Sequence, residues 1–220
     1  MHEERIWMRG VRWLAGVDEA GRGPLAGPVV AAAVVFPRGW SIDGVADSKL
    51  LSEARREELY EVIARTARGV GIGVVDHTEI DRLNILNATF KAMHTAVAAL
   101  SEPPEHLLID GNLFRPEVDR GASSCDLPYT TLVDGDAKSF LVAAASIIAK
   151  VMRDRLMLDY DRAYPEYGFA EHKGYATARH REALRRLGPC PIHRRSFSLG
   201  QQWVVTLPGG SATGGPAETG

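Results

Sequence analysis

Two early apolar segments have the pattern of neighbouring β-strands. Residues 13–18 form a short apolar run that ends in a carboxylate, and residues 29–36 form a continuous apolar run that stops before Pro37. Continuous, partly β-branched runs of this length are typical of buried strands. Residues 21–28 between them contain three glycines and two prolines, a composition that favours neither helix nor strand. We therefore predict a hairpin across residues 21–28, which we call the glycine turn.

The remainder of the chain alternates between short apolar runs and helical periodicity. Strands are predicted at 69–75, 106–111 and 129–133, and helices at 52–67, 78–100, 136–160 and 177–187. Ser52 is expected to cap the first of these helices, and an alanine-rich face on the third is expected to pack closely on a sheet. We expect a frayed arm at 1–11, a loop at 121–126 and a disordered tail at 208–220, where Gly, Ala and Thr dominate without an apolar anchor.

This order of elements predicts an α/β fold. Three antiparallel strands followed by strand–helix alternation indicate a mixed five-stranded sheet flanked by helices. A length of 220 residues accommodates one domain with a sizeable core. We expect that domain to span residues 1–200, with a small helical extension at about 160–200.

Composition excludes several classes of protein. Hydrophobic content of 45% and charged content of 25% are those of an ordinary soluble domain. The longest apolar runs are too short to span a bilayer, and no signal peptide is visible at the N-terminus. Cys125 and Cys190 form neither a zinc-binding pair nor a disulfide framework. A cytoplasmic protein that acts as a monomer, away from membranes, is expected.

The charge distribution is uneven. A net charge of −2 argues against indiscriminate coating of nucleic acid, but residues 172–195 are strongly basic. This basic segment contains Lys173, Arg179, Arg181, Arg185, Arg186, Arg194 and Arg195, together with His172, His180 and His193. Such a cluster predicts a surface that faces phosphates; the alternative is a solvated helix face.

Asp18 and Glu19 stand where the first strand meets the glycine turn. Side chains alternate along a strand, so the two carboxylates converge only if the strand ends or twists between them. One alternative is a solvated strand end. Another is a dinucleotide-binding loop, although its third glycine would come one residue late and a strand, not a helix, follows.

Two distant acids favour a shared site with that pair. Asp110 ends a predicted strand and Asp136 begins a predicted helix; alone, each could be a turn residue or a helix cap. Mg²⁺ favours carboxylate and water ligands, so convergent acids would suit a site for divalent cations.

The motifs resemble those of ribonuclease HII, the type 2 ribonuclease H family, over about residues 12–200. The first block is Gly16-Val17-Asp18-Glu19-Ala20-Gly21-Arg22-Gly23-Pro24-Leu25-Ala26-Gly27-Pro28. It is followed in family order by Asp47-Ser48-Lys49-Leu50-Leu51-Ser52, Ile109-Asp110-Gly111-Asn112, Gly135-Asp136-Ala137-Lys138, the run from Ala143 to Asp154, His172-Lys173-Gly174-Tyr175-x-Thr177 and His193-Arg194-x-Ser196-Phe197.

This resemblance implies a ribonuclease H-like fold and a metal-dependent endonuclease. Its substrates would be RNA–DNA hybrids and duplex DNA with embedded ribonucleotides, and its products would carry 3′-hydroxyl and 5′-phosphate ends. The resemblance assigns Asp18, Glu19, Asp110 and Asp136 to catalysis and to two Mg²⁺ or Mn²⁺ ions. A non-catalytic hybrid-binding protein with the same fold is the competing interpretation, and four intact acids argue against it.

The resemblance also implies substrate contacts. The backbone of Gly21, Arg22 and Gly23 would contact the 2′-hydroxyl of the ribonucleotide, the group that distinguishes RNA from DNA. Tyr175 would lie against the next deoxyribose, or alternatively be a half-buried loop residue. The phosphate contacts would be Lys49, Ser146 and Lys173; Ser146 could instead be a small packing residue.

One position departs from the family pattern. The family usually has a basic residue before the Gly-Asp of the fourth block, and this chain has Asp134. The extra acid leaves two candidates for the metal ligand. We favour Asp136, because the frame from Gly135 to Lys138 is intact, and Asp134 could weaken substrate affinity or alter metal preference.

Overall fold

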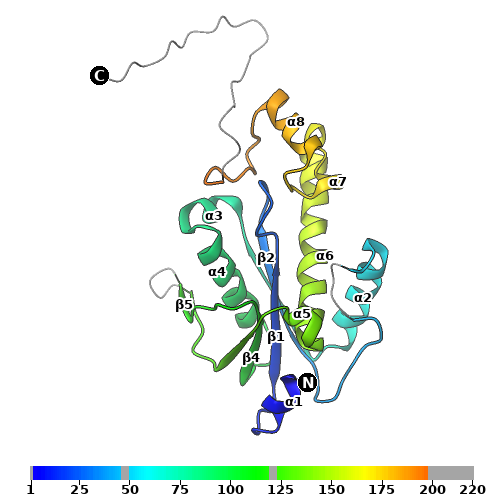
Figure 1. The fold of residues 1–220 in the computed structure, drawn as a ribbon, viewed down its shortest axis with the longest axis vertical. Coiled ribbons are helices and arrows are strands. Elements are labelled where there is room, and N and C mark those ends of the chain that lie inside the picture. The colour runs from blue at the N-terminus through cyan, green and yellow to red at the C-terminus, as the bar shows by residue number, and fades with distance from the viewer. Residues whose placement is uncertain (1, 46–49, 119–122, 198–220) are drawn as a thin grey trace, which may run out of the picture.

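The structure is a computed structural model that describes residues 2–45, 50–118 and 123–197. Its centre is a mixed five-stranded sheet in the order β3-β2-β1-β4-β7 (Figure 1). These strands are β1 (Leu14–Ala20), β2 (Val29–Val35), β3 (Gly69–Val75), β4 (His106–Asp110) and β7 (Tyr129–Leu132). β1 pairs antiparallel with β2, and β2 antiparallel with β3. β4 pairs parallel with both β1 and β7. The predicted hairpin and mixed sheet are confirmed.

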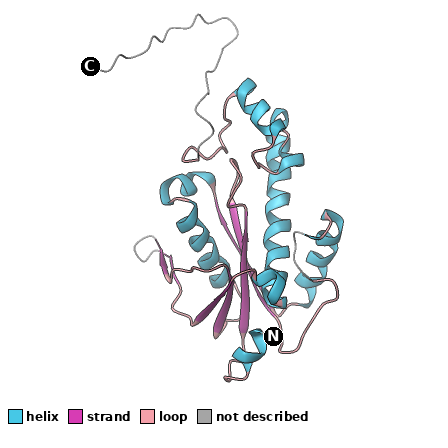
Figure 2. Cartoon of the chain, viewed as in Figure 1, coloured by secondary structure: helices cyan, strands magenta, loops and turns pink. Residues whose placement is uncertain are grey.

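Helices cover both faces of the sheet (Figure 2). They are α1 (His2–Trp7), α2 (Glu53–Thr66), α3 (His77–Leu83), α4 (Ile85–Ala98), α5 (Gly135–Lys138), α6 (Phe140–Ala163), α7 (Phe169–His172) and α8 (Ala178–Leu187), with a 3₁₀ turn η2 (Pro165–Tyr167). On one face, α4 packs Phe90 and Met93 against β1–β3. On the other, α2 and α6 pack against the side chains that point the opposite way from the same strands, as strand alternation requires.

Small residues let these helices approach the sheet closely. A Cβ on Gly16 of β1 would lie 2.2 Å from the Leu141 carbonyl carbon, at the start of α6. Ala144, Ala145 and Ala149 of α6 are fully buried. The predicted alanine face is therefore confirmed, and it holds α6 tightly beside the strand that carries Asp18 and Glu19.

Four sequence predictions of local structure need correction. Residues 2–7 are helical, not a frayed arm, because Ile6 and Trp7 are buried in the core. The predicted helix 78–100 is interrupted at Asn84, whose φ of 66° ends α3 and whose side chain caps α4. The helix predicted from Asp136 is interrupted at Ser139, whose hydroxyl accepts from the Val142 amide. Within the predicted loop 121–126, β6 (Ser123–Ser124) pairs with β5 (Glu117–Val118). The predicted tail at 208–220 lies outside the described residues.

The C-terminal helices build a separate hydrophobic cluster. Phe169, Leu184 and Ile192 pack there with Leu25 and Ala26 of the glycine turn and Met157 of α6. α7 and α8 therefore lie at the end of the molecule to which the glycine turn projects, opposite α1 (Figure 1). This arrangement places the motif around Tyr175 beside the motif around Asp18.

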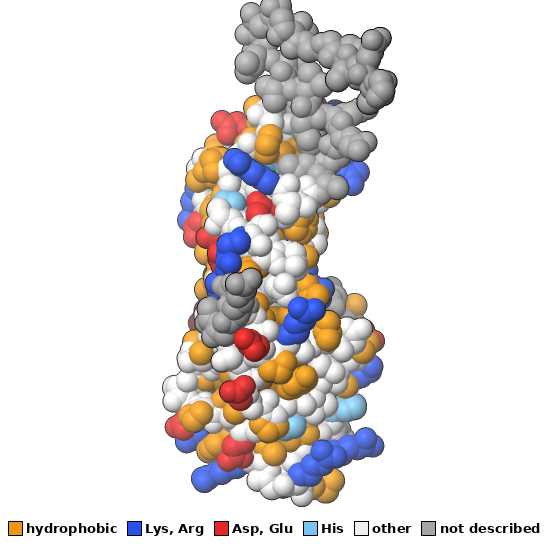
Figure 3. All heavy atoms as spheres, turned by 90° about the vertical axis from the view of Figure 1, so that its left-hand side faces the viewer, with side chains coloured by type: hydrophobic (Ala, Val, Ile, Leu, Met, Phe, Trp, Pro, Cys, Tyr) orange, Lys and Arg blue, Asp and Glu red, His pale blue; other side chains and the backbone are white. Residues whose placement is uncertain are grey.

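The surface carries mixed charge. On the face drawn in Figure 3, acidic and basic side chains are interspersed, without a continuous basic surface. No helix among the described residues combines the length and apolarity needed to cross a membrane.

Candidate active site

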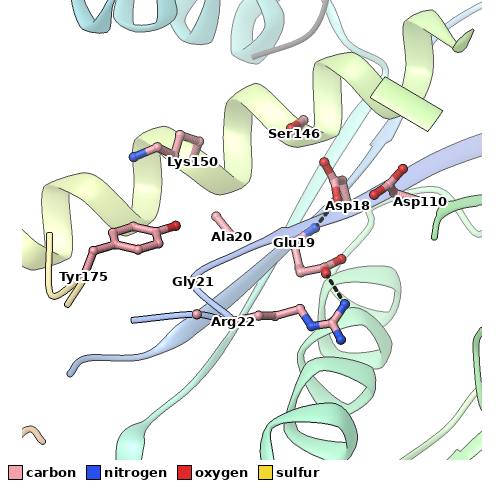
Figure 4. A pocket seen from close by; sticks show the side chains of 10 residues that line it. Asp18, Glu19, Ala20, Gly21, Arg22, Asp110, Ser146, Lys150 and Tyr175 are labelled. Atoms are coloured by element: carbon pink, nitrogen blue, oxygen red, sulfur yellow. Dashed lines mark hydrogen bonds and ion pairs between the residues drawn. The ribbon is translucent and has the colours of Figure 1, made fainter. Parts of the chain in front are cut away.

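A cleft opens where β1 and β4 end beside α6 (Figure 4). It is lined by Asp18, Glu19, Ala20, Gly21, Arg22, Gly23, Asp110, Ser146, Lys150 and Tyr175. The sheet register explains why acids meet here. β1 and β4 are parallel and Val17 is paired with Ile109, so the next residue on each strand, Asp18 and Asp110, reaches the same edge. Two residues 92 positions apart are thereby brought side by side.

Asp18 is the most enclosed of these acids, with 5% of its surface exposed. Its side chain points toward α6 and forms a hydrogen bond with Ser146. Its Oδ1 also accepts from the Glu19 amide at 2.7 Å. Burial raises the pKa of Asp18 well above its ordinary value, and repulsion from Glu19 and Asp110 raises it further. Asp18 is thus a buried carboxylate surrounded by other carboxylates.

Glu19 points away from Asp18 because β1 continues to Ala20 and its side chains alternate. The strand does not end between the two acids, so they diverge from adjacent positions (Figure 4). Glu19 Oε1 accepts from Arg22 Nη1 at 3.1 Å. Burial raises the pKa of Glu19, and the neighbouring Arg22 guanidinium opposes that rise. Glu19 lines the cleft while its carboxylate is held by an arginine of the glycine turn.

Asp136 lies next to a residue that is bonded to the site, but it does not line the cleft. Asp110 Oδ1 accepts from the Gly135 amide at 2.7 Å, which fixes the start of α5 against the end of β4. Asp136 follows Gly135 and is 5% exposed, but it is not among the residues that line the cleft. Within the part of the chain that the structure describes, no three Asp, Glu, His or Cys side chains stand ready to hold a metal ion.

Some of the predicted substrate contacts line the cleft and others do not. Gly21, Arg22, Gly23, Ser146 and Tyr175 line the cleft, and a Cβ on Gly23 would lie 3.7 Å from the Tyr175 ring. Lys173 does not line it. Its Nζ donates to the Ala170 carbonyl at 2.6 Å and lies 3.7 Å from Glu53 Oε1. Lys49 lies outside the described residues.

The basic segment is only partly a surface, which corrects the sequence prediction. His172, His180, His193 and Arg194 are buried, so they contribute no exposed charge. Arg179 and Arg185 are exposed but form ion pairs with Glu171 and Glu182. A count of basic residues does not reveal burial, and this is why the prediction failed for these positions.

Sequence reasoning missed Lys150 as a residue of the cleft. It lies one helical turn after Ser146 on α6, so both point to the same side, and its Nζ pairs with Asp154 at 2.5 Å. Burial lowers the pKa of Lys150. Helical spacing from Ser146 was the signal that could have found it.

Comparison with known proteins identifies the family of this site. The family described as Ribonuclease HII matches residues 15–199, nearly the whole of the described chain. The chain belongs to the ribonuclease HII family. Ribonuclease HII proteins are RNA–DNA hybrid endoribonucleases, so this chain is an enzyme of that class.

Individual relatives agree with this assignment. Ribonuclease HII of Geobacter sulfurreducens is 55% identical over 197 residues, covering 89% of this chain and 86% of the relative. Ribonuclease HII of Clostridioides difficile is 52% identical over 195 residues, covering 89% and 73%. Ribonuclease HII sequences therefore align with both the acid-bearing sheet and the C-terminal helices.

Solved structures show the same fold. Ribonuclease H2 of Pyrococcus horikoshii OT3 has a TM-score of 0.70 at 29% identity, covering 85% of this chain and 94% of its own. Ribonuclease HII of Archaeoglobus fulgidus, solved in a complex with PCNA, has a TM-score of 0.65 at 30% identity, covering 86% and 97%. The expected ribonuclease H-like α/β fold is confirmed.

Proposed function

We propose that this enzyme cleaves the RNA strand of hybrids and also incises duplex DNA at single embedded ribonucleotides, leaving 3′-hydroxyl and 5′-phosphate ends. The observation that carries the proposal is the meeting of Asp18, Glu19 and Asp110 beside the glycine turn. Acids that could hold cations thus adjoin a backbone segment suited to reading a sugar. A hybrid-binding protein without catalysis would have no need for crowded carboxylates at this point.

The donor set fits divalent metal ions. Carboxylate oxygens are the ligands that Mg²⁺ and Mn²⁺ prefer, and the buried Asp18 carboxylate faces repulsion from Asp110 and Glu19. A cation would relieve that repulsion. We assign Asp18, Glu19, Asp110 and Asp136 as its ligands. When bound, a pair of such ions would activate water and neutralise the charge on the scissile phosphate.

For all four acids to bind the ions, two of their side chains must first move. Glu19 must release Arg22, and Asp136 must turn toward the cleft from its place next to Gly135. We propose that both adjustments are side-chain rotations, because β1, β4 and the start of α5 are already joined by the sheet and by the bond from Gly135 to Asp110. These backbone connections support a single site for the four acids.

The chain's other cleft residues would position the nucleic acid. Gly21, Arg22 and Gly23 offer backbone groups to the 2′-hydroxyl and adjacent phosphate, and the Tyr175 ring stands beside Gly23 to contact the following deoxyribose. Ser146 would contact a phosphate from α6. Lys49 and Lys173 are proposed as further phosphate contacts, and Lys173 would first have to leave the Ala170 carbonyl.

Product mapping tests this function. A duplex with one ribonucleotide, labelled at either end, is incubated with the enzyme and Mg²⁺ or Mn²⁺. We expect a single cut at the ribonucleotide and ends that a ligase and a phosphatase report as 3′-hydroxyl and 5′-phosphate. Asp18→Asn is the matched control. Binding of the duplex without cleavage in either metal would favour the non-catalytic alternative.

A further inference from the structure

The glycine turn rests on two buried arginines. Arg194 and Arg153 are 0% and 1% exposed, and neither forms an ion pair with a carboxylate among the residues that the structure describes. Their partners are backbone carbonyls of the turn. A buried charge is costly unless its hydrogen bonds are satisfied, so the turn must present those carbonyls inward. Burial and the neighbouring Arg153 guanidinium lower the pKa of Arg194 to about 9.

Arg194 makes four of these bonds with one side chain. Its Nη2 donates to the carbonyls of Gly21 at 2.6 Å and Pro28 at 3.1 Å, its Nη1 to that of Arg22 at 3.0 Å, and its Nε to that of Gly27 at 2.9 Å. The two ends of the glycine turn are therefore joined by one guanidinium. Arg153 contacts the Pro28 and Ala26 carbonyls, and neither of those belongs to the Gly21–Gly23 tip.

The direction of the turn's carbonyls also determines which way its amide N–H groups point. The peptide bonds of the described residues are all trans, so each amide N–H points opposite to the carbonyl before it. With the Gly21 and Arg22 carbonyls directed at Arg194, the amides of Arg22 and Gly23 point away from it. Neither amide donates to a protein acceptor among the described residues, and both residues line the cleft. Two successive outward amides form a nest for an anionic or hydroxyl oxygen.

We propose that Arg194 is a specificity-determining positioning residue, which holds the Gly21 and Arg22 carbonyls inward so that the Arg22 and Gly23 amides are aimed at the 2′-hydroxyl and adjacent phosphate of the substrate. This inference rests on the proposed function and deepens it. Arg194 itself is buried and is not among the residues that line the cleft. Its flat, forked guanidinium reaches carbonyls at separate positions, which the single ammonium of lysine cannot do.

Arg194→Lys tests the inference against Arg153→Lys, its matched control. Both replace a buried, carbonyl-bonded arginine beside the same turn, so both should lower the melting temperature. Each is made in the Asp18→Asn chain, and fluorescence anisotropy measures its affinity for a labelled duplex with one ribonucleotide and for the all-DNA duplex of the same sequence. We expect Arg194→Lys to lower the preference for the ribonucleotide by about tenfold, the effect of losing one or two hydrogen bonds to substrate.

Arg153→Lys should leave that ratio within about twofold of the parent, because Arg153 does not hold the tip carbonyls. A ratio unchanged by Arg194→Lys, or lowered equally by both variants, would overturn the positioning role. If the parent itself binds both duplexes equally, recognition of the ribonucleotide fails as a function, and the role of Arg194 falls with it. The two failures are therefore distinguishable.

If Arg194→Lys fails to fold, hydrogen exchange on the Asp18→Asn chain tests the orientation of the two amides. The Arg22 and Gly23 amides should exchange freely in the unbound protein and become protected on the ribonucleotide duplex, more strongly than on the DNA duplex. The Arg194 Nε–H should be protected throughout. Amides already protected in the unbound protein, or equally protected by the two duplexes, would contradict the proposed orientation.

Discussion

Two adjoining regions at the end of β1, the acid cleft and the glycine turn, differ in how their polar groups are satisfied. In the acid cleft, Asp18 lies buried against other carboxylates, and its pKa is raised by burial and then by that repulsion. In the adjoining glycine turn, two buried arginines bond only to carbonyls of residues 21–28. The carbonyls of the turn are bonded within the protein, whereas the acids of the cleft repel one another. The comparison indicates that the two arginines hold the shape of the turn, and the repulsion between the acids supports the proposed cation site.

Among the variants that test this contrast, Asp18→Asn should have the largest effect. Removing a buried, repelled carboxylate should leave the melting temperature unchanged or higher, because the amide avoids the cost of burying a charge. Turnover should fall by roughly 10³-fold or more, as expected when several kcal/mol of metal-assisted stabilisation is lost. Cleavage of labelled hybrid and thermal melting measure the two effects. Loss of folding together with loss of activity would show that Asp18 is a structural residue.

A second test separates Asp136 from Asp134. The Asp134 side chain is 74% exposed beside Lys138, whereas Asp136 is buried next to the residue that bonds Asp110. We expect Asp136→Asn to lower cleavage by about 10²-fold, through a lost metal ligand. Asp134→Lys, the exposed control, should retain cleavage or bind hybrid more tightly. Cleavage lost only in Asp134→Lys would transfer the ligand role to that residue.

The sequence predicted the meeting of acids better than their orientation. Asp18 and Asp110 could be placed together because each ended an apolar strand, and strand ends on one edge converge. The direction of Glu19 stayed open, since it depended on whether β1 ends or twists between Asp18 and Glu19. The pairing of Glu19 with Ala31 shows that the strand continues past both residues. A local hydrophobic pattern predicts that a strand exists more reliably than it predicts the residue at which the strand ends.

Positions that depend on tertiary burial were not predictable. Arg194 looked like one more charge in a basic segment, yet it is buried under a turn 166 to 173 residues earlier in the chain. α1 looked like an arm because its few apolar residues gain their partners only from the folded core. The break at Asn84 had a weak signal, because Asn tolerates left-handed backbone more readily than most residues, but helical periodicity continued through it.

Tyr175→Ala should have a moderate, substrate-dependent effect. Tyr175 is 44% exposed and lines the cleft, with the Arg153 guanidinium over its ring, so removal of the ring should not disturb the core. We expect kcat/KM to fall by about tenfold on duplexes with an RNA–DNA junction, the loss of one ring contact to a nucleotide, and by less on continuous hybrids. Tyr175→Phe should retain most activity. Equal losses on both substrates would argue against a junction-reading role.

The smallest effect at neutral pH is expected from two buried histidines, His180 and His193, which lie beside the backbone of Tyr175. His180 Nδ1 donates to the Tyr175 carbonyl at 2.9 Å, and its Nε2 lies 3.0 Å from His193 Nε2. Because the carbonyl only accepts, a neutral His180 leaves a lone pair at Nε2 for the His193 proton. Protonation of His180 would set two N–H groups against each other.

Stability should therefore fall as acid is added. Burial lowers the pKa of both His180 and His193 to about 4, whereas unfolded histidine titrates near 6.5. Between these values the unfolded chain binds more protons than the folded one, so the free energy of unfolding decreases as pH falls from about 6.5 toward 4. Urea denaturation across this range measures the slope. His180→Gln should reduce that slope while leaving the titration of surface acids in place, and an unchanged slope would show that the pair does not titrate as its contacts require.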